Sequence, residues 1–305
     1  MVRMVPKLNI VIPARCEYPQ IVWTVYSLLN DIPPEQPHQI VVVSNGEDDE
    51  TRKMDKWFSG GALAKSGRLK ILTYDEAFHP YTAHKHAIDT LQLEGLLCYC
   101  CGHAAVQRDT LPKMMQLACR SDVGVVHSPM LYMGDVTDTE NRWKLYGYKD
   151  PVKRGWSFRR VSDKPYKWFG GGGGLTMMKL DDYHALRLGD PPWRRGLGGA
   201  EELTDLKFWM FNKTVWIHPD CLYYHWAKSR GFTWKMHEHY WNQLVAYYCL
   251  AGREYMEQQN QTFSYPQSSS VLDEVEQLCK EHRQWILDNA SYTMEEVLKK
   301  QPWLH

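Results

Sequence analysis

Short apolar runs alternate with segments of helical periodicity along the first 130 residues, and this alternation limits the possible folds more than any other feature of the chain. The apolar runs cover residues 8–13, 39–44, 69–73 and 96–100. Between them, apolar residues recur at helical spacing over residues 21–29, 49–58 and 81–93. Repeated strand and helix units of this kind form parallel sheets. We therefore expect an α/β fold, with a mostly parallel sheet, helices on both of its faces, and ligands at the carboxyl ends of the strands.

The second half of the chain continues this pattern and then becomes helical. Further strands are expected at 175–178, 215–217 and 222–224, with a helix at 201–211. After residue 233 the spacing is helical, with a polar interruption at 258–270. We expect an α/β domain with two halves and a helical C-terminal extension, at residues 1–232 (1–130 and 131–232) and 233–305.

Composition and charge exclude several classes of protein. Apolar residues make up 44% of the chain, which is normal for a globular protein and too many for a disordered one. The 36 lysines and arginines balance the 36 aspartates and glutamates, so attraction to a polyanion requires a local patch. No apolar run approaches the roughly 20 residues that span a bilayer, and no signal peptide is recognisable. The eight cysteines show no paired framework. These features predict a cytoplasmic protein, in the host cytoplasm if it is viral, with reduced thiols and no membrane partner.

Five motifs stand where strands end or helices begin. They are Ile12-Pro13-Ala14-Arg15-Cys16-Glu17, Ser44-Asn45-Gly46-Glu47-Asp48-Asp49, Tyr81-Thr82-Ala83-His84-Lys85-His86-Ala87, Cys101-Gly102-His103 and Leu197-Gly198-Gly199-Ala200-Glu201-Glu202-Leu203-Thr204-Asp205. Their order resembles that of the GT-A glycosyltransferases, and most closely the family 2-like and polypeptide N-acetylgalactosaminyltransferase-like members. The resemblance covers residues 8–228 and implies a hexosyltransferase with a nucleotide-sugar donor, expected to be a UDP-sugar. Residues 1–130 would bind the donor and residues 131–232 the acceptor.

The resemblance also assigns residues to the donor. In the family, the first two motifs contact uridine and ribose, a basic helix residue lies near the diphosphate, and glycines before a strand line the sugar site. Carried over by motif, the donor residues are Pro13, Ala14, Arg15, Glu17, Asn45, Lys85, Gly102, Gly172 and Gly173. Two of them have simpler alternatives, because Glu17 can stabilise a helix N-terminus and Lys85 can be an exposed helix residue. We expect His84 and His86 to be polar surface residues.

The turn after the fourth apolar run departs from the family pattern. In relatives this turn is Asp-x-Asp or Asp-Ser-His and binds Mn²⁺ or Mg²⁺, whereas here it is Cys101-Gly102-His103. His225 matches the position of a further histidine ligand in relatives. The resemblance therefore implies a divalent metal bound by His103, His225 and Cys101. A thiol and imidazoles suit softer ions than Mg²⁺. The alternative is two histidines with protein partners and a cysteine of the core.

The segment at 197–205 is similar to the family's "GGED" or "WGGEN" segment, which implies a catalytic carboxylate. In inverting relatives this carboxylate is the general base that removes the proton of the acceptor hydroxyl. Glu202 matches the base best, and Glu201 is second. The alternative is an acidic first turn that stabilises its own helix.

A basic and aromatic segment over residues 142–167 is the main indication of the acceptor. Nine cations, seven aromatic residues and only two aspartates fall between residues 141 and 168. Such a segment suits a groove that tracks phosphates and stacks bases, or a loop that covers the donor diphosphate. We expect a hydroxymethylated DNA base as acceptor, as for DNA-modifying bacteriophage enzymes with related folds. A protein or small-molecule acceptor, a catalytically inactive binding protein and a sugar-nucleotide pyrophosphorylase are the alternatives.

Overall fold

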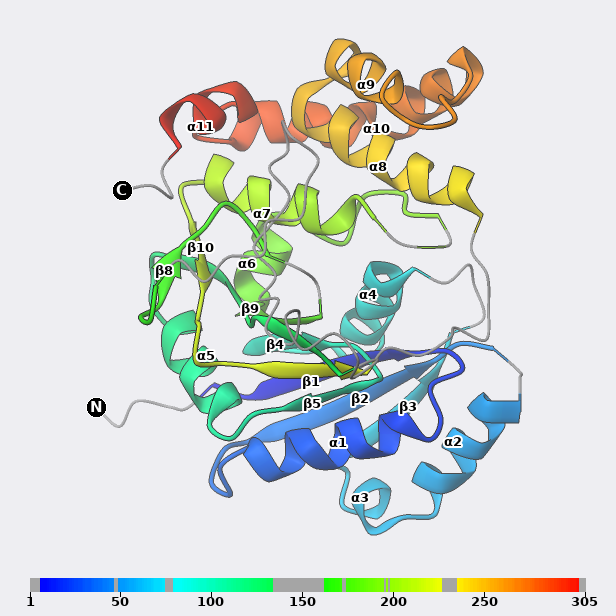
Figure 1. Ribbon diagram of the computed structural model, residues 1–305, viewed down its shortest axis with the longest axis vertical. Coiled ribbons are helices and arrows are strands. Elements are labelled where there is room, and N and C mark those ends of the chain that lie inside the picture. The colour runs from blue at the N-terminus through cyan, green and yellow to red at the C-terminus, as the bar shows by residue number, and fades with distance from the viewer. Residues whose placement is uncertain are drawn as a thin grey trace.

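The computed structural model describes residues 6–301, except 47–48, 75–78, 134–161, 172–173, 195, 197 and 227–234. Its centre is an eight-stranded sheet with the strand order β3-β2-β1-β4-β9-β6-β10-β8 (Figure 1). These strands are β1 (Leu8–Ala14), β2 (His38–Ser44), β3 (Leu69–Thr73), β4 (Leu96–Cys100), β6 (Val123–His127), β8 (Tyr166–Lys167), β9 (Leu175–Lys179) and β10 (Thr214–Ile217). β9 runs antiparallel to β4 and β6, and β8 runs antiparallel to β10, while the other pairs are parallel. The predicted mostly parallel sheet is confirmed.

Helices cover both faces of this sheet (Figure 1). One face carries α1 (Gln20–Asp31), α2 (Asp49–Ser59), α3 (Ala62–Lys65) and α5 (Thr110–Ala118). The other carries α4 (Pro80–Leu91), α6 (Leu180–Ala185) and α7 (Ala200–Met210). The elements expected from the sequence are present with boundaries shifted by at most two residues. None of the helices in the described part of the chain is long and apolar enough to cross a membrane.

The sheet separates two hydrophobic clusters because successive residues of a strand point to opposite faces. In β1, Ile10 and Ile12 belong to the cluster under α1, α2 and α5, whereas Val11 belongs to the cluster under α4 and α7. This second cluster continues into the terminal helices α8 (Met236–Ala251), α9 (Arg253–Asn260), α10 (Ser269–Asn289) and α11 (Met294–Lys300). The helical extension is thus packed on the sheet domain through one continuous core, and the proposed division of the chain stays a prediction.

A second, three-stranded sheet joins distant parts of the sequence. It has the order β5-β11-β7 and consists of β5 (Ala104–Val106), β11 (Tyr223–Trp226) and β7 (Met130–Met133). β11 pairs antiparallel with β5 and parallel with β7. The chain that follows β4 is thereby held against the chain near residue 225.

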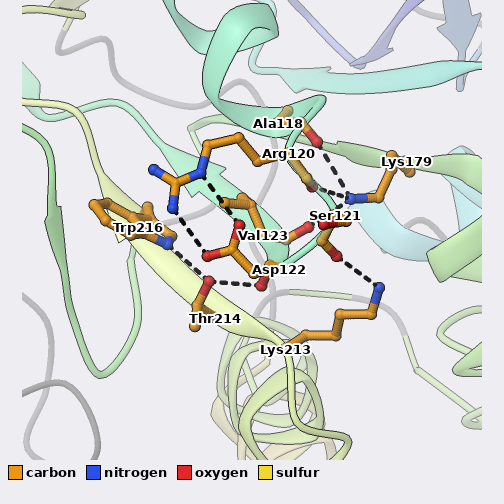
Figure 2. Close-up of polar contacts among 9 residues, drawn as sticks. All are labelled: Ala118, Arg120, Ser121, Asp122, Val123, Lys179, Lys213, Thr214 and Trp216. Carbon is orange, nitrogen blue, oxygen red and sulfur yellow. Dashed lines mark hydrogen bonds and ion pairs between the residues drawn. The ribbon is translucent and has the colours of Figure 1, made fainter.

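Lys179, the last residue of β9, connects the sheet to the C-terminal end of α5 through hydrogen bonds (Figure 2). Its Nζ donates hydrogen bonds to the carbonyl oxygens of Ala118 at 3.3 Å, Arg120 at 2.8 Å and Val123 at 2.6 Å. Ala118 ends α5, and the last carbonyls of a helix have no partner within it, so Lys179 supplies a missing donor there. The carbonyls of Arg120 and Val123 lie in the turn after α5 and at the start of β6. Lys213 adds a bond to the neighbouring Ser121 carbonyl at 3.2 Å.

Lys179→Met is expected to lower the free energy of unfolding by about 2–4 kcal/mol, because three carbonyls lose a charged donor at once. Urea denaturation measures this loss. Lys280→Met, at an exposed position of α10, is the control and should change stability by less than about 0.5 kcal/mol. Equal effects of the two variants would contradict the role of Lys179.

Lys207 is a fully buried lysine between α7 and α10. Its Nζ lies 3.0 Å from Nε2 of His282. Burial lowers the pKa of Lys207 to about 7 and the pKa of His282 to about 3. The unfolded chain, in which a lysine has a pKa of about 10.4, therefore binds one more proton than the folded protein between pH 7 and 10.

This proton difference predicts a pH dependence of stability. The contribution of Lys207 to the unfolding free energy should rise by about 1.4 kcal/mol per pH unit across this window and be constant below it. Buried thiols such as Cys98, whose pKa burial raises, act in the opposite direction. The measured quantity is therefore the difference between the wild type and Lys207→Met at each pH. A difference that does not change between pH 7 and 9 would show that Lys207 is charged in the folded protein.

Candidate active site

Three potential ligand side chains meet where β4 adjoins the small sheet. Cys101 and His103 follow β4, and His225 lies in β11. One ligand atom from each, the Cys101 sulfur and a ring nitrogen of each histidine, lies within 4.8 Å of the others. The Nε2 atoms of His103 and His225 are 2.9 Å apart, and the ring centroids are 4.4 Å apart. The structure thus brings together the three residues that the sequence predicts for a metal site.

The backbone of the small sheet sets this proximity. β11 pairs with β5 so that His225 lies opposite Ala104, and the N–H of Trp226 donates to the carbonyl oxygen of His103 at 3.0 Å. On the other side, the N–H of Cys101 donates to the carbonyl oxygen of Gly174 at 3.0 Å. Both ends of the turn are therefore held by regular backbone hydrogen bonds.

Glu17 orients one of the two histidines. Its Oε2 lies 2.9 Å from Nδ1 of His103, and the side chains of Glu17 and His103 are only 11% and 12% exposed. A carboxylate at Nδ1 favours the tautomer that has its proton there and leaves the Nε2 lone pair facing the cluster. Glu17 lies just after β1, where the sequence predicts a nucleotide contact, and that role stays a prediction beside the observed one.

Gly102 allows Glu17 to reach His103. A Cβ atom on residue 102 would lie 2.9 Å from Cγ of Glu17 and 3.2 Å from its Cδ, which is closer than side chains tolerate. The family resemblance assigns Gly102 to the donor, and the structure supplies a further reason for a glycine at this place. The backbone of the turn and the side chain of Glu17 share the same narrow space.

The acidity of Cys101 suits a metal ligand. A hydrogen bond from Cys100 lowers the pKa of the Cys101 thiol well below its usual range. A hydrogen bond with His225 and the charge of His103 act in the same direction, against the effect of burial. The thiolate is the form of cysteine that binds metals.

The donor set fits a divalent transition metal better than Mg²⁺. One sulfur and two imidazole nitrogens are soft or borderline ligands, whereas Mg²⁺ prefers oxygen. The two Nε2 atoms are 2.9 Å apart, so one ion could contact both histidines.

The carboxyl ends of β1 and β2 bring predicted donor residues together. Pro13 and Ala14 pair in parallel register with Val43 and Ser44 at the ends of these strands. Just beyond them, Nη1 of Arg15 donates to Oδ1 of Asn45 at 3.2 Å. Ligands of open α/β sheets bind at this edge, so the four predicted residues of β1 and β2 lie where a nucleotide is expected.

Other predicted donor residues lie elsewhere. Lys85 lies in α4 and forms an ion pair with Asp89, and its side chain is exposed. An exposed pair of this kind adds little stability. Gly172 and Gly173 lie outside the described residues. Most of the basic and aromatic segment at 142–167 also lies outside them, and only residues 162–167 are described.

Gly170 and Gly171 lie next to a buried polar network that the sequence did not predict. His127 places Nδ1 at 3.0 Å from Oγ1 of Thr176 and Nε2 at 2.9 Å from Oδ1 of Asp205. The second oxygen of Asp205 accepts a hydrogen bond from the N–H of Gly171 at 2.8 Å. A Cβ on Gly171 would lie 2.2 Å from the His127 ring. Gly170 and Gly171 thus pass close to buried side chains. The signal for this network in the sequence was a histidine that ends an apolar run.

Glu201 and Glu202 begin α7, directly after Gly199 with its positive φ of 79°. Burial raises the pKa of Tyr81 in α4. The negative charges of Glu201 and Glu202 raise this pKa further, and Glu201 contributes more than Glu202. Glu201 is partly exposed. Glu202 is partly exposed and makes no hydrogen bond or ion pair within the described part of the chain. A free, accessible carboxylate is what a general base requires.

The expectation that His84 is a surface residue is wrong. Its ring stacks on Tyr99, with centroids 3.8 Å apart and an angle of 4° between the planes. Burial keeps the pKa of His84 well below its usual range, so the ring is neutral. His84 belongs to the face of α4 that packs on the sheet.

Comparisons with known proteins agree with this architecture. A sequence profile described as Glycosyl transferase family 2 matches residues 9–187. A search of curated protein sequences finds no match. A crystal structure of GalNAc-T7 with UDP, GalNAc and Mn²⁺ has a TM-score of 0.69 at 15% identity, over 94% of this chain and 56% of that chain. This chain thus spans less than two thirds of the length of that relative.

Two further structures are similar. Mannosyltransferase PcManGT from Pyrobaculum calidifontis, in complex with GDP-Man and Mn²⁺, has a TM-score of 0.53 at 14% identity, over 97% of this chain and 76% of that chain. S. aureus TarS, residues 1–349, has a TM-score of 0.53 at 12% identity, over 88% of this chain and 69% of that chain. At these identities the likeness shows a shared GT-A-like fold.

Proposed function

Because this chain belongs to glycosyl transferase family 2, we propose that it transfers a sugar from a nucleotide-sugar donor to an acceptor hydroxyl. The observation that carries the proposal is the meeting of Cys101, His103 and His225 beside the carboxyl end of β4. Sheet edges of this kind bind nucleotides in α/β folds. The similar GalNAc-T7 and PcManGT structures hold a nucleoside diphosphate or nucleotide sugar together with Mn²⁺.

In the proposed reaction, the acceptor oxygen forms a bond to the anomeric carbon while the bond from that carbon to the diphosphate breaks. Glu202 takes the proton of the hydroxyl, and the nucleoside diphosphate leaves with the electron pair. A divalent cation bound by His103, His225 and Cys101 would supply positive charge to the leaving diphosphate. Glu17 holds a proton at Nδ1 of His103 and so keeps Nε2 available to the cation.

The proposed donor is a UDP-sugar. The pairing of Arg15 with Asn45 at the ends of β1 and β2 presents guanidinium and amide groups where the family binds the base and ribose. Asn45 is fixed in turn, since its Nδ2 donates to the carbonyl oxygen of Tyr74. An amide that is held in this way can distinguish hydrogen-bond donors from acceptors on a base edge.

The acceptor that we favour is a hydroxymethylated base in DNA. The support is the excess of cations and aromatic residues at 142–167, which suits phosphates and stacked bases. Such a base would have to flip out of the duplex to meet Glu202. A protein hydroxyl or a small molecule is the second candidate, and a sugar-nucleotide binding protein without activity is the third.

The test of the function is release of nucleoside diphosphate from a panel of UDP-sugars and GDP-sugars with Mn²⁺, Mg²⁺ or Zn²⁺. We expect metal-dependent release that falls roughly 10²-fold or more in His225→Ala, because one ligand is lost. His237→Ala, at an exposed position of α8, is the matched control and should keep full activity. If no metal gives release while a UDP-sugar still binds, the chain is an inactive member of the family.

A second arm of the same assay tests the acceptor. Duplexes with and without hydroxymethylated bases are compared at the best donor and metal. Release that requires the modified base supports a DNA acceptor. If release of nucleoside diphosphate does not change when DNA is added, the protein is a transferase but DNA is not its acceptor.

A further inference from the structure

Three large aromatic side chains are exposed on the helices that cover one face of the sheet. Trp23 is 66% exposed and Tyr26 45% exposed in α1, and Trp57 is 52% exposed in α2. Both helices lie on the same face, which is the lower one in Figure 1. α1 buries the side toward the sheet through residues such as Ile21, so Trp23 and Tyr26 point outward. Large aromatic side chains that are exposed on one side of a protein are candidates for an interaction site.

Exposed cations lie on the same side of the sheet, on α2 and in the segment that follows it. Residues 49–70 hold six lysines and arginines against three carboxylates, although the chain as a whole is balanced. One of the six, Arg52, pairs with Asp49 in the first turn of α2. Of the other five, four are exposed on α2, α3 or just before β3: Lys53, Lys56, Lys65 and Arg68. Lys70 is paired with Val41 in β2 and points to the other face of the sheet. We call Trp23, Tyr26, Trp57 and these four cations the aromatic-basic face.

We propose that the aromatic-basic face docks this protein on an anionic lipid surface. Trp and Tyr prefer the interface between water and lipid, where the ring is buried and its polar edge stays hydrated. Lysines attract anionic head groups, and their long stems let the charge reach the head groups while aromatic rings insert. α2 carries both kinds of side chain, since Trp57 lies in the same helix as Lys53 and Lys56.

The mix of cations favours lipid over nucleic acid. Three of the four cations of this face are lysines, which act as mobile point charges. Nucleic-acid surfaces make more use of arginine, whose planar group binds phosphates and bases with two hydrogen bonds. The sequence predicts no membrane partner on the ground that no apolar run is long enough to span a bilayer, and docking through surface side chains needs no such run.

The test is flotation of the full chain with vesicles of phosphatidylcholine alone or mixed with phosphatidylserine. We expect binding only to the mixed vesicles, and weaker binding at higher salt. Lys53→Gln with Lys56→Gln should weaken binding by roughly 25-fold, because each cation near an anionic surface contributes about fivefold. Trp23→Ala with Trp57→Ala should weaken it by about tenfold or more, since apolar insertion is lost.

The control is Tyr265→Ala with Lys280→Gln, which removes an exposed aromatic residue and a cation from the terminal helical region. It should bind like the wild type, and thermal unfolding should show that all variants are folded. The proposal is overturned if the wild type binds neither vesicle, if it binds both equally, or if the control variant loses as much binding. Duplex DNA binding that is lost in the same variants, without vesicle binding, would overturn it in favour of a nucleic-acid surface. None of these outcomes depends on glycosyl transfer.

Discussion

Glu202→Gln is expected to lower kcat by about 10²–10⁴-fold while donor binding changes little, because only the proton transfer from the acceptor is lost. Glutamine keeps the size of the side chain and its position in the first turn of α7. The partly exposed carboxylate has no hydrogen-bond or ion-pair partner in the described chain, so its loss leaves no buried group unpaired. The measurements are kcat with saturating acceptor and the dissociation constant of the donor.

Glu201→Gln is the matched control, since it changes the adjacent carboxylate in the same turn. Glu201→Gln removes an equal charge from the same turn and leaves the proposed base in place, so it should keep a kcat close to that of the wild type. If kcat falls in Glu201→Gln but not in Glu202→Gln, then Glu201 is the general base. Equal, small effects would mean that neither residue is the base.

The central sheet was predictable because its strands are buried on both faces and read as continuous apolar runs. All five residues of β4, for example, are buried, and their sequence has no polar position apart from cysteine and tyrosine. The small sheet was less predictable. β5 has three residues, which is too few for a period to be recognised.

Part of the site depends on contacts that no local pattern encodes. The resemblance placed Cys101, His103 and His225 at one metal site, and the fold brings them together. The contact of Glu17 with His103 requires that β1 and β4 are neighbours in the sheet. The error at His84 has a similar origin, because the polarity of a histidine did not reveal that its ring stacks on Tyr99.

Gly102→Ala is expected to weaken metal binding by about 10–100-fold, although it adds only one methyl group. The added Cβ would lie 2.9 Å from Cγ of Glu17, so the Glu17 side chain must move. Its carboxylate then leaves Nδ1 of His103, and the ring is no longer held with Nε2 toward His225. The backbone at residue 102 does not have a positive φ, so the steric effect on Glu17 is the main cost of the alanine.

Two further variants separate the orienting contact from crowding. Gly60→Ala is the control, because nothing lies within 4 Å of a Cβ at that position. Combining Gly102→Ala with Glu17→Ala removes the crowded side chain, so thermal stability should recover while metal affinity should stay low. Affinity is measured by calorimetric titration with Mn²⁺ and Zn²⁺, which needs neither donor nor acceptor. If the double variant regains full affinity, crowding alone disturbed the site, and the hydrogen bond from Glu17 to His103 does not orient the histidine.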